Sequence, residues 1–444
     1  MSMYRHTRRD FLRTSGTLPF AASLAGSAVT HRSAAASSVS SLMNLNDKMK
    51  RAREVALNIL KPTPKQLEHG LELHANSLVI EPYGFSPRSA IDGDRIRRAM
   101  ESGASNIEIL DMTEEMRMTR CVTDPVERRE YTDAWQASGV TCIFQNAGEE
   151  GNDIRRLIKR LARFTYVTDM MRDFIFKAVT PDDIVEAWKQ NRRCLYLSGN
   201  GVPMPMDWVS MEEELRYIRI FFQLGIRMMH LTYNRRNAIG DGCAEPANGG
   251  LSDFGQAVVA EMNRVGIIVD VAHAGWRTSL EAVQISQRPI VASHTVCNSV
   301  HEHIRAKPDE VIKAIADKGG LIGICCIPRF LGGTGDISAM MDHIDYAVKL
   351  VGAEHVAIAT DLAYSSRNGD REWEKVPERG ARRANWEQLW PPDDFVSRPE
   401  MMQSMAWTNW PLFTVGLVQR GHSDEDIQKI LGNNALRVAR DVIS

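Results

Sequence analysis

Two histidines and one aspartate stand where a hydrolytic metal site could be built. His273, His294 and Asp361 each close a short apolar run rich in β-branched residues. Neutral imidazole nitrogen and carboxylate oxygen are the usual ligands of Zn²⁺ outside thiolate sites. A cation bound in this way lowers the pKa of a water molecule toward about 7 and so supplies hydroxide. A single histidine is more often a hydrogen-bonded core residue, but three such groups at strand ends favour a metal site.

The elements that would position these groups repeat along the chain. Short apolar runs of strand length alternate with stretches whose apolar residues have the three-and-four spacing of a helix. This pattern is typical of a parallel sheet covered by helices. Eight such units predict an α/β fold, a (β/α)₈ TIM-type barrel, with functional groups at the carboxyl ends of the strands. The predicted strands are 78–83, 140–146, 194–198, 226–232, 267–273, 289–294, 321–327 and 356–361.

Capping residues support the predicted helix boundaries. Ser252 with Asp253 can cap a helix, and Gly266 ends that helix before the next strand. Gly225 ends another helix in the same way. The clearest helical spacing lies in 211–224, 251–265 and 308–318.

The segment from Ala363 to Ala406 interrupts this alternation after the eighth strand. It is charged and Pro-rich, and it carries Trp373, Trp386 and Trp390. A long loop at this place in a barrel lies at the C-terminal mouth. Two alternatives stay open: a lid over the pocket, or a solvated excursion.

The composition excludes several functions. The chain has 444 residues, of which 43% are hydrophobic, enough for one large core or two ordinary ones. The 54 basic and 56 acidic residues leave a net charge of -2, so no overall field would hold nucleic acid or an anionic membrane. A small neutral or zwitterionic substrate fits better. The seven cysteines are scattered without CxxC spacing, which indicates neither a disulfide framework nor a thiolate zinc site.

The N-terminus has the pattern of an export signal. Arg8 and Arg9 precede Phe11 and Leu12, and a weakly apolar stretch follows from residue 18 to residue 29. This stretch is too short and too rich in Gly and Ser to span a bilayer core of about 30 Å. Paired arginines are instead an address that an export receptor recognises.

We therefore predict three parts: a twin-arginine signal peptide at 1–36, a helical lead-in at 37–76 and the barrel at 77–444. The predicted location is the periplasm or another extracytoplasmic space. The expected partners are the twin-arginine export machinery and a small-molecule or dipeptide-like substrate, with no nucleic acid and no stable membrane span. Whether the mature protein is a monomer or a homodimer stays open.

Longer stretches add to these single residues. They cover most of the chain after Leu78 and include 224–234, 250–255, 262–273, 291–294, 316–323 and 431–438. In this order they resemble the membrane (renal) dipeptidases, a family of zinc-dependent amidohydrolase-type barrels.

The resemblance implies roles for four residues. His273 and His294 match the two histidines that bind one zinc of the family's pair. Asp361 matches the acid beside the metals, which contacts the substrate's amino end or a bridging water. Arg305 matches the arginine that pairs with the substrate carboxylate, a role suited to a planar fork of donors.

Several other ligands of the family are replaced. Tyr83 and Phe85 stand at the His-x-Asp pair of the first strand, and Ser198 stands at the bridging glutamate. Tyr233 stands at the histidine of a Thr-His-Asn motif. These replacements argue against a two-zinc site and favour one zinc ion.

A third ligand is then needed beside His273 and His294, since three protein ligands and a water make a catalytic zinc site. Asp361 is the first candidate and Glu81 the second. The alternative for Glu81 is a pair with an arginine near the rim.

Two tyrosines and an asparagine, all with hydrogen-bonding groups, are the remaining candidates for the pocket. Tyr83 and Asn200 are predicted to bind substrate, and Tyr233 is predicted to be catalytic, because tyrosine can donate to an oxyanion. Simple packing at the mouth is the alternative for all three.

The leading hypothesis is a one-metal hydrolase acting on an amide bond in a small, dipeptide-like substrate. In it Asp361 handles the proton, Tyr233 stabilises the oxyanion and Arg305 holds a carboxylate. Two alternatives stay open on the same fold: an isomerase, lyase or tailoring enzyme of a peptide-derived metabolite, and a non-catalytic binding protein.

Overall fold

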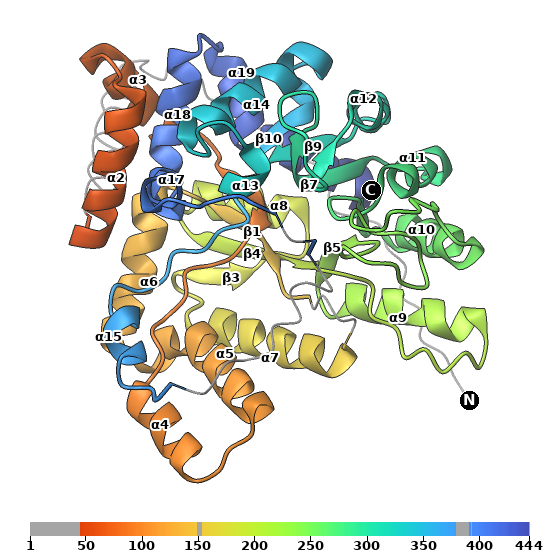
Figure 1. Ribbon diagram of the computed structural model, residues 1–444, viewed down its shortest axis with the longest axis horizontal. Coiled ribbons are helices and arrows are strands. Elements are labelled where there is room, and N and C mark those ends of the chain that lie inside the picture. The colour runs from red at the N-terminus through yellow and green to blue at the C-terminus, as the bar shows by residue number, and fades with distance from the viewer. Residues whose placement is uncertain (1–44, 149–152, 379–389, 392, 444) are drawn as a thin grey trace, which may run out of the picture.

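A parallel barrel of eight strands forms the centre of the protein (Figure 1). The computed structural model describes residues 45–148, 153–378, 390, 391 and 393–443. The strand order is β1-β2-β4-β5-β6-β7-β9-β10, so each strand lies beside the one that precedes it in the barrel, and the paired neighbours are parallel. The strands are β1 Ile80–Gly84, β2 Cys142–Asn146, β4 Arg193–Gly199, β5 Ile226–His230, β6 Ile268–Asp270, β7 Ile290–Cys297, β9 Leu321–Ile324 and β10 Val356–Ile358. The predicted (β/α)₈ barrel and its eight strands are confirmed.

The first and last strands of this order are joined at their carboxyl ends. The Asp361 N–H donates to the Tyr83 carbonyl at 3.3 Å, and the Phe85 N–H donates to the Leu362 carbonyl at 3.2 Å. Two short strands, β3 Ile175–Lys177 and β8 Ala306–Lys307, pair with β4 and β7 outside the barrel order.

Side chains fill the barrel interior in layers. Met228 on β5 pairs in register with Ile268 on β6, and both belong to one buried apolar cluster. Side chains two places apart on a strand point to the same face. His230 and Asp270, which also pair in register, therefore lie one layer nearer the carboxyl ends, inside the barrel.

Helices cover the outside of the barrel (Figure 1). Ser252 caps α10 by accepting from the Gly255 N–H at 2.9 Å, and Gly266 ends this helix in the left-handed region at φ 89°. The predicted caps and the three predicted helices are thus confirmed. The helices that follow β1 to β5 are α4 Gly93–Glu101, α5 Asn106–Thr123, α6 Pro125–Ser138, α7 Ile154–Met170, α8 Pro181–Lys189, α9 Met211–Gln223 and α10 Asp253–Val265. Those that follow β6 to β10 are α11 Trp276–Ile285, α12 Asp309–Asp317, α13 Pro328–Leu331, α14 Ile337–Val351, α15 Gly369–Trp373, α17 Pro399–Ser404, α18 Trp410–Gln419, α19 Asp424–Gln428 and α20 Asn434–Ile443.

Two helices precede the barrel in the described chain. Helices α2 Asp47–Leu60 and α3 Pro64–Ala75 pack against α17 and α18 from the other end of the sequence (Figure 1). The predicted signal peptide at 1–36 lies outside the described residues. None of the helices in the described ranges is long and apolar enough to cross a membrane.

Candidate metal centre

Three imidazole rings meet at the carboxyl ends of neighbouring strands. His230 ends β5, His273 follows β6 and His294 lies on β7. Their ring centres are 5.2 Å apart for His230 and His273, 5.2 Å for His230 and His294, and 4.9 Å for His273 and His294. Imidazoles that share one tetrahedral zinc at about 2.0 Å per nitrogen have ring centres separated by about 5 Å. The spacing of the three rings therefore fits a common cation.

Asp270 completes a group of ligands with two of these rings. The donor atoms of His230, Asp270 and His294 all lie within 4.8 Å of one another, and all three residues are buried. Asp270 is oriented through Oδ1, which accepts from the Ala272 N–H at 2.9 Å and the Ser293 N–H at 3.0 Å. Its other oxygen, Oδ2, is left facing His230.

The contact between His230 and Asp270 lacks the geometry of a hydrogen bond. Nε2 of His230 lies 2.7 Å from Oδ2 of Asp270. Nevertheless, within the described chain neither ring nitrogen of His230 nor that oxygen has a hydrogen-bond partner. A buried polar group without a partner costs about 1–3 kcal/mol. A cation between these atoms would remove that cost, so the residues present fit a metal ion with N and O ligands.

The other two histidines are held with Nε2 toward the centre. His273 donates through Nδ1 to Oδ1 of Asn234 at 2.7 Å, and Nδ1 of His294 is hydrogen-bonded to Oγ of Ser293 at 2.9 Å. Their Nε2 atoms are 3.0 Å apart. Partners of this kind on the far nitrogen fix the orientation of metal-binding histidines.

Burial keeps these rings neutral. Burial, together with the charge of Arg305, holds the pKa of both His273 and His294 well below its usual value. Burial opposes ionisation of Asp270, but the charge of His230 and the contacts from Ser293 outweigh it, so the pKa of Asp270 is lowered. Neutral rings at His273 and His294 beside an ionised Asp270 are the protonation states that a divalent cation requires.

Of the three ligands predicted from the sequence, the structure brings His273 and His294 together. Asp361 lies after β10, half-buried, with φ 57°. It is not in the three-ligand group of the described residues, which contains His294 alone of the predicted set. Its predicted role as a ligand stays a prediction.

Glu81, the second candidate ligand, is bonded elsewhere. It is fully buried on β1, where it accepts from the Thr360 N–H at 2.9 Å and from Nε1 of Trp407 at 2.5 Å. Burial raises its pKa to about 8. Neither a place in the metal group nor the alternative, an arginine partner at the rim, is seen in the described chain.

Tyr83 and Asn200, the predicted substrate ligands, are brought together. The Tyr83 hydroxyl donates to Oδ1 of Asn200 at 2.7 Å. The Tyr83 ring is buried and stacks on His294, with ring centres 3.9 Å apart and planes inclined by 12°. Tyr83 therefore forms one wall of the metal centre, where the family resemblance places a zinc ligand.

Tyr233 and the long loop lie on the outer side of His273. The half-buried Tyr233 ring stacks on His273 with ring centres 4.2 Å apart. Trp390, from the segment 363–406, lies 6.4 Å from each of these rings. The described part of that loop thus reaches the mouth of the barrel above the imidazoles.

Arg305 is fully buried behind the two histidines. Its guanidinium donates to the Ala272 carbonyl and, at 3.0 Å, to the His294 carbonyl. These contacts hold the ends of β6 and β7 together and so position His273 and His294. The carboxylate-binding role predicted for Arg305 stays a prediction.

Sequence reasoning missed His230 and Asp270 as candidate ligands. Both are polar residues inside predicted strands, and each has an apolar residue on either side in the sequence. In a parallel strand buried on both faces, such a residue needs a polar neighbour. That signal, taken for two neighbouring strands together, could have identified the pair.

Comparison with known proteins places this site in a family. The model of the membrane dipeptidase family, peptidase family M19, matches residues 106–377, more than half of the chain. The chain belongs to the membrane dipeptidase family. The predicted resemblance is therefore confirmed.

Two curated relatives of this chain are dipeptidases of fungi. The chain is 29% identical to dipeptidase aclJ of Aspergillus oryzae over 231 residues, which are 51% of this chain and 47% of the relative. It is 30% identical to dipeptidase verJ of Clonostachys rogersoniana over 228 residues, 51% of this chain and 50% of the relative. The chain thus spans about half the length of the curated relatives it matches.

Two solved structures share the fold. An amidohydrolase from Pseudomonas aeruginosa is 26% identical with a TM-score of 0.60, covering 84% of this chain and 98% of its own. The probable dipeptidase PvdM from the same organism is 18% identical with a TM-score of 0.59, covering 86% and 99%.

Proposed function

We propose that this protein is a metal-dependent hydrolase that cleaves the amide bond of a small, dipeptide-like substrate with a single zinc-like cation. The observation that carries the proposal is the buried group of His230, Asp270 and His294, in which both nitrogens of His230 lack a hydrogen-bond partner within the described chain. Family membership and the names of the relatives support amide hydrolysis as the reaction.

The cation would be held by His230, Asp270 and His294, with His273 beside them. A cation of this type polarises a carbonyl and lowers the pKa of water. Asn234 and Ser293 keep the imidazoles oriented from behind. This arrangement supports one ion, because Tyr83 fills the space next to His294 with an aromatic ring.

Two residues at the mouth are suited to the proton and charge changes of the reaction. Asp361 is half-buried at the end of the last strand and would accept and return the proton. Tyr233, stacked on His273, would donate to the oxygen that becomes negative at the scissile carbonyl. Tyr83 and Asn200 would bind the substrate from the opposite wall.

A cavity of about 680 Å³ adjoins Trp390 on the outer side of His273. Its size is within the range of small-molecule sites. Glu245, Glu302 and Asp393 line it, and His303 is its only basic side chain among the described lining residues. Asp393 is paired with Arg329 at 3.2 Å and Glu245 lies 4.0 Å from Arg235, so Glu302 is the carboxylate best placed to favour the ammonium group of a substrate. The cavity therefore supports a substrate with a free amino end.

Removal of the metal tests this proposal. We expect about one zinc per chain in purified protein, measured by elemental analysis. Dialysis against a chelator should abolish hydrolysis of a dipeptide panel, and added Zn²⁺ should restore it. Protein that holds no metal, or that hydrolyses dipeptides equally well after chelation, would contradict the proposal. A metal-loaded protein without activity on any dipeptide would favour another reaction class on the same fold.

We also propose export by the twin-arginine route, on the basis of Arg8 and Arg9 and the apolar stretch behind them. Changing both arginines to lysine (R8K/R9K) should leave the precursor in the cytoplasm, because the export receptor distinguishes the arginine pair. Cell fractionation and immunoblotting measure this, with Arg51→Lys as the control. An R8K/R9K precursor that is still exported would rule out this route.

A further inference from the structure

A second cavity, of about 250 Å³, opens beside the barrel mouth. It lies between the segment that follows β1, the end of β2 and helices α5 and α7. Four guanidinium groups line it, and Glu114 is the only carboxylate among its described lining residues. We call this cavity the arginine pocket, after Arg88, Arg117, Arg156 and Arg160.

Two of these arginines form no ion pair with a described residue, although the charge of Glu114 acts on both and the charge of Asp361 acts on Arg88. Glu114 is bound by Arg160 at 2.7 Å, by Arg163 at 2.8 Å and by Arg156 at 3.1 Å. Among the described residues, the guanidinium groups of Arg88 and Arg117 make no hydrogen bond and no ion pair. Arg88 lies over the Phe85 ring, 4.7 Å from its centre. The pocket therefore has an excess of positive charge and free donors.

The segment that carries Arg88 is fixed from both sides. Its backbone N–H donates to the Tyr364 carbonyl at 2.8 Å, and its carbonyl accepts from the Ser366 N–H at 2.9 Å. These bonds join the segment to the chain that follows β10.

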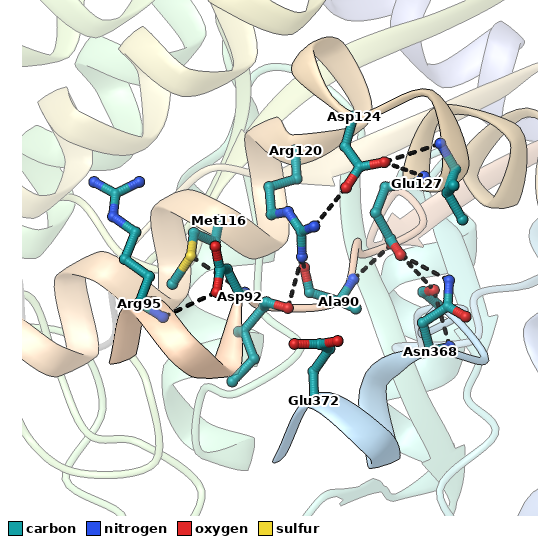
Figure 2. A network of polar contacts seen from close by, with 12 residues as sticks. Ala90, Asp92, Arg95, Met116, Arg120, Asp124, Glu127, Asn368 and Glu372 are labelled. Atoms are coloured by element: carbon teal, nitrogen blue, oxygen red, sulfur yellow. Dashed lines mark hydrogen bonds and ion pairs between the residues drawn. The ribbon is translucent and has the colours of Figure 1, made fainter. Parts of the chain in front are cut away.

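Figure 2 shows the anchor on the other side of this segment. Nη1 of Arg120 donates to the Ala90 carbonyl at 2.9 Å, and the Ala90 N–H donates to Glu127 at 2.7 Å. Glu127 also accepts from Asn368 at 2.8 Å. Because both ends are held, little ordering cost remains when a ligand binds to Arg88.

Aromatic contacts connect the arginine pocket to the metal centre. The Tyr83 ring stacks on His294 at 3.9 Å, and the Phe85 ring lies 6.1 Å from Tyr83. The guanidinium carbon of Arg88 lies over the Phe85 ring, 4.7 Å from its centre. In this series of contacts, two aromatic rings, those of Phe85 and Tyr83, separate Arg88 from His294.

The two cavities at the mouth have opposite charge. The acidic cavity lies beside the loops that follow β5, β6 and β7, and the arginine pocket lies beside β1 and β2, across the barrel. Arg305 is only 1% exposed and is bonded to backbone carbonyls. Among the described residues that line the arginine pocket, Arg88 and Arg117 carry guanidinium groups that form no ion pair.

We infer that the arginine pocket binds a carboxylate of the substrate that lies beyond its α-carboxylate, such as an acidic side chain. The inference rests on the proposed function and names the substrate class: dipeptide-like molecules with a second acidic group. Arginine forks suit this role because they bind carboxylates through two parallel, charge-assisted hydrogen bonds.

Two matched dipeptides test the substrate assignment. L-Ala-L-Glu and L-Ala-L-Gln have the same shape and differ in the side-chain charge. We expect a kcat/KM about 10-fold higher for L-Ala-L-Glu, mainly through a lower KM, since hydrogen bonds to charged groups contribute about 1.5–3 kcal/mol and this pocket is partly open to solvent. R117Q and R88Q should lose this preference, whereas the exposed control R95Q should keep it. Equal kcat/KM for both dipeptides, or a preference that survives in R117Q and R88Q, would overturn the inference.

A second experiment does not depend on hydrolysis. Phenylglyoxal modifies accessible arginines, and peptide mass spectrometry measures the extent at each site. Glutarate, a free dicarboxylate, should protect Arg88 and Arg117 at least about 5-fold while Arg95 remains reactive. Protection without dipeptide hydrolysis would reject the proposed function and keep the pocket as a carboxylate site. Protection without the L-Ala-L-Glu preference would show that the pocket binds free organic acids, and so would overturn the substrate assignment. Modification unchanged by glutarate would overturn the carboxylate site itself.

Discussion

Replacement of His294 with alanine (H294A) should remove both the metal and the activity. We expect the zinc content to fall from about one ion per chain to below about 0.1, and kcat/KM for dipeptides to fall at least about 10³-fold. His294 has this effect because it belongs to both sets of ligands, the buried group with His230 and Asp270 and the predicted pair with His273. Elemental analysis of the folded protein measures the first change and a dipeptide assay measures the second.

A buried histidine outside the site provides the matched control. His74 is as buried as His294, and its two nitrogens contact Oγ1 of Thr414 at 2.8 Å and the Ser138 carbonyl at 2.9 Å. H74A should therefore lower the melting temperature, while the folded protein keeps its metal. If H294A and H74A both retained a full complement of zinc, the metal centre would have to lie elsewhere.

The barrel could be predicted from the sequence because its strands are buried on both faces. Each strand then becomes a continuous apolar run, and the polar residue that ends the run marks the carboxyl end. His273 and His294 stand at such ends, and the structure places their Nε2 atoms 3.0 Å apart. The positions at which the two apolar runs end were therefore sufficient to predict that these two side chains lie at the same end of the barrel.

The positions of His230 and Asp270 depend on the register between two strands, which the sequence of a single strand does not contain. His230 and Asp270 meet because β5 and β6 pair with Met228 opposite Ile268, and a shift of one residue would turn both side chains out of the barrel. Glu81 shows the same limit. Its partner Trp407 lies 326 residues away in the sequence, and no local pattern connects the two.

Arg305 illustrates a different limit. The family resemblance matches Arg305 to an arginine that pairs with the substrate carboxylate. In the structure its terminal nitrogens donate to the Ala272 and His294 carbonyls. The side chain reaches these carbonyls because it is buried behind the strand ends, which the sequence does not specify. The guanidinium groups of Arg88 and Arg117, which line the arginine pocket in the described chain, come from segments without any motif.

Variants of His230, Asp270 and Asp361 distinguish the buried group of ligands from the predicted group of His273, His294 and Asp361. H230L and D270N should weaken zinc binding at least about 100-fold, because each removes a ligand of the buried group. D361N should keep the metal and lose about 10²- to 10³-fold in kcat, because it removes the carboxylate that is expected to handle the proton. Asparagine at 270 retains an oxygen that can accept from the Ala272 and Ser293 N–H groups, so the strand ends should stay in place.

The absorption of protein loaded with Co²⁺ in place of Zn²⁺ gives a readout that does not depend on turnover. Its d–d bands respond to the number and type of ligands, so they should change in H230L and D270N and stay unchanged in D361N. The reverse pattern, with the bands altered by D361N alone, would mean that the ion lies at the mouth between His273, His294 and Asp361. In that case Nδ1 of His230 would stay without a hydrogen bond in the described chain, and only the contact of Nε2 with Asp270 at 2.7 Å would offset the cost of burying this ring.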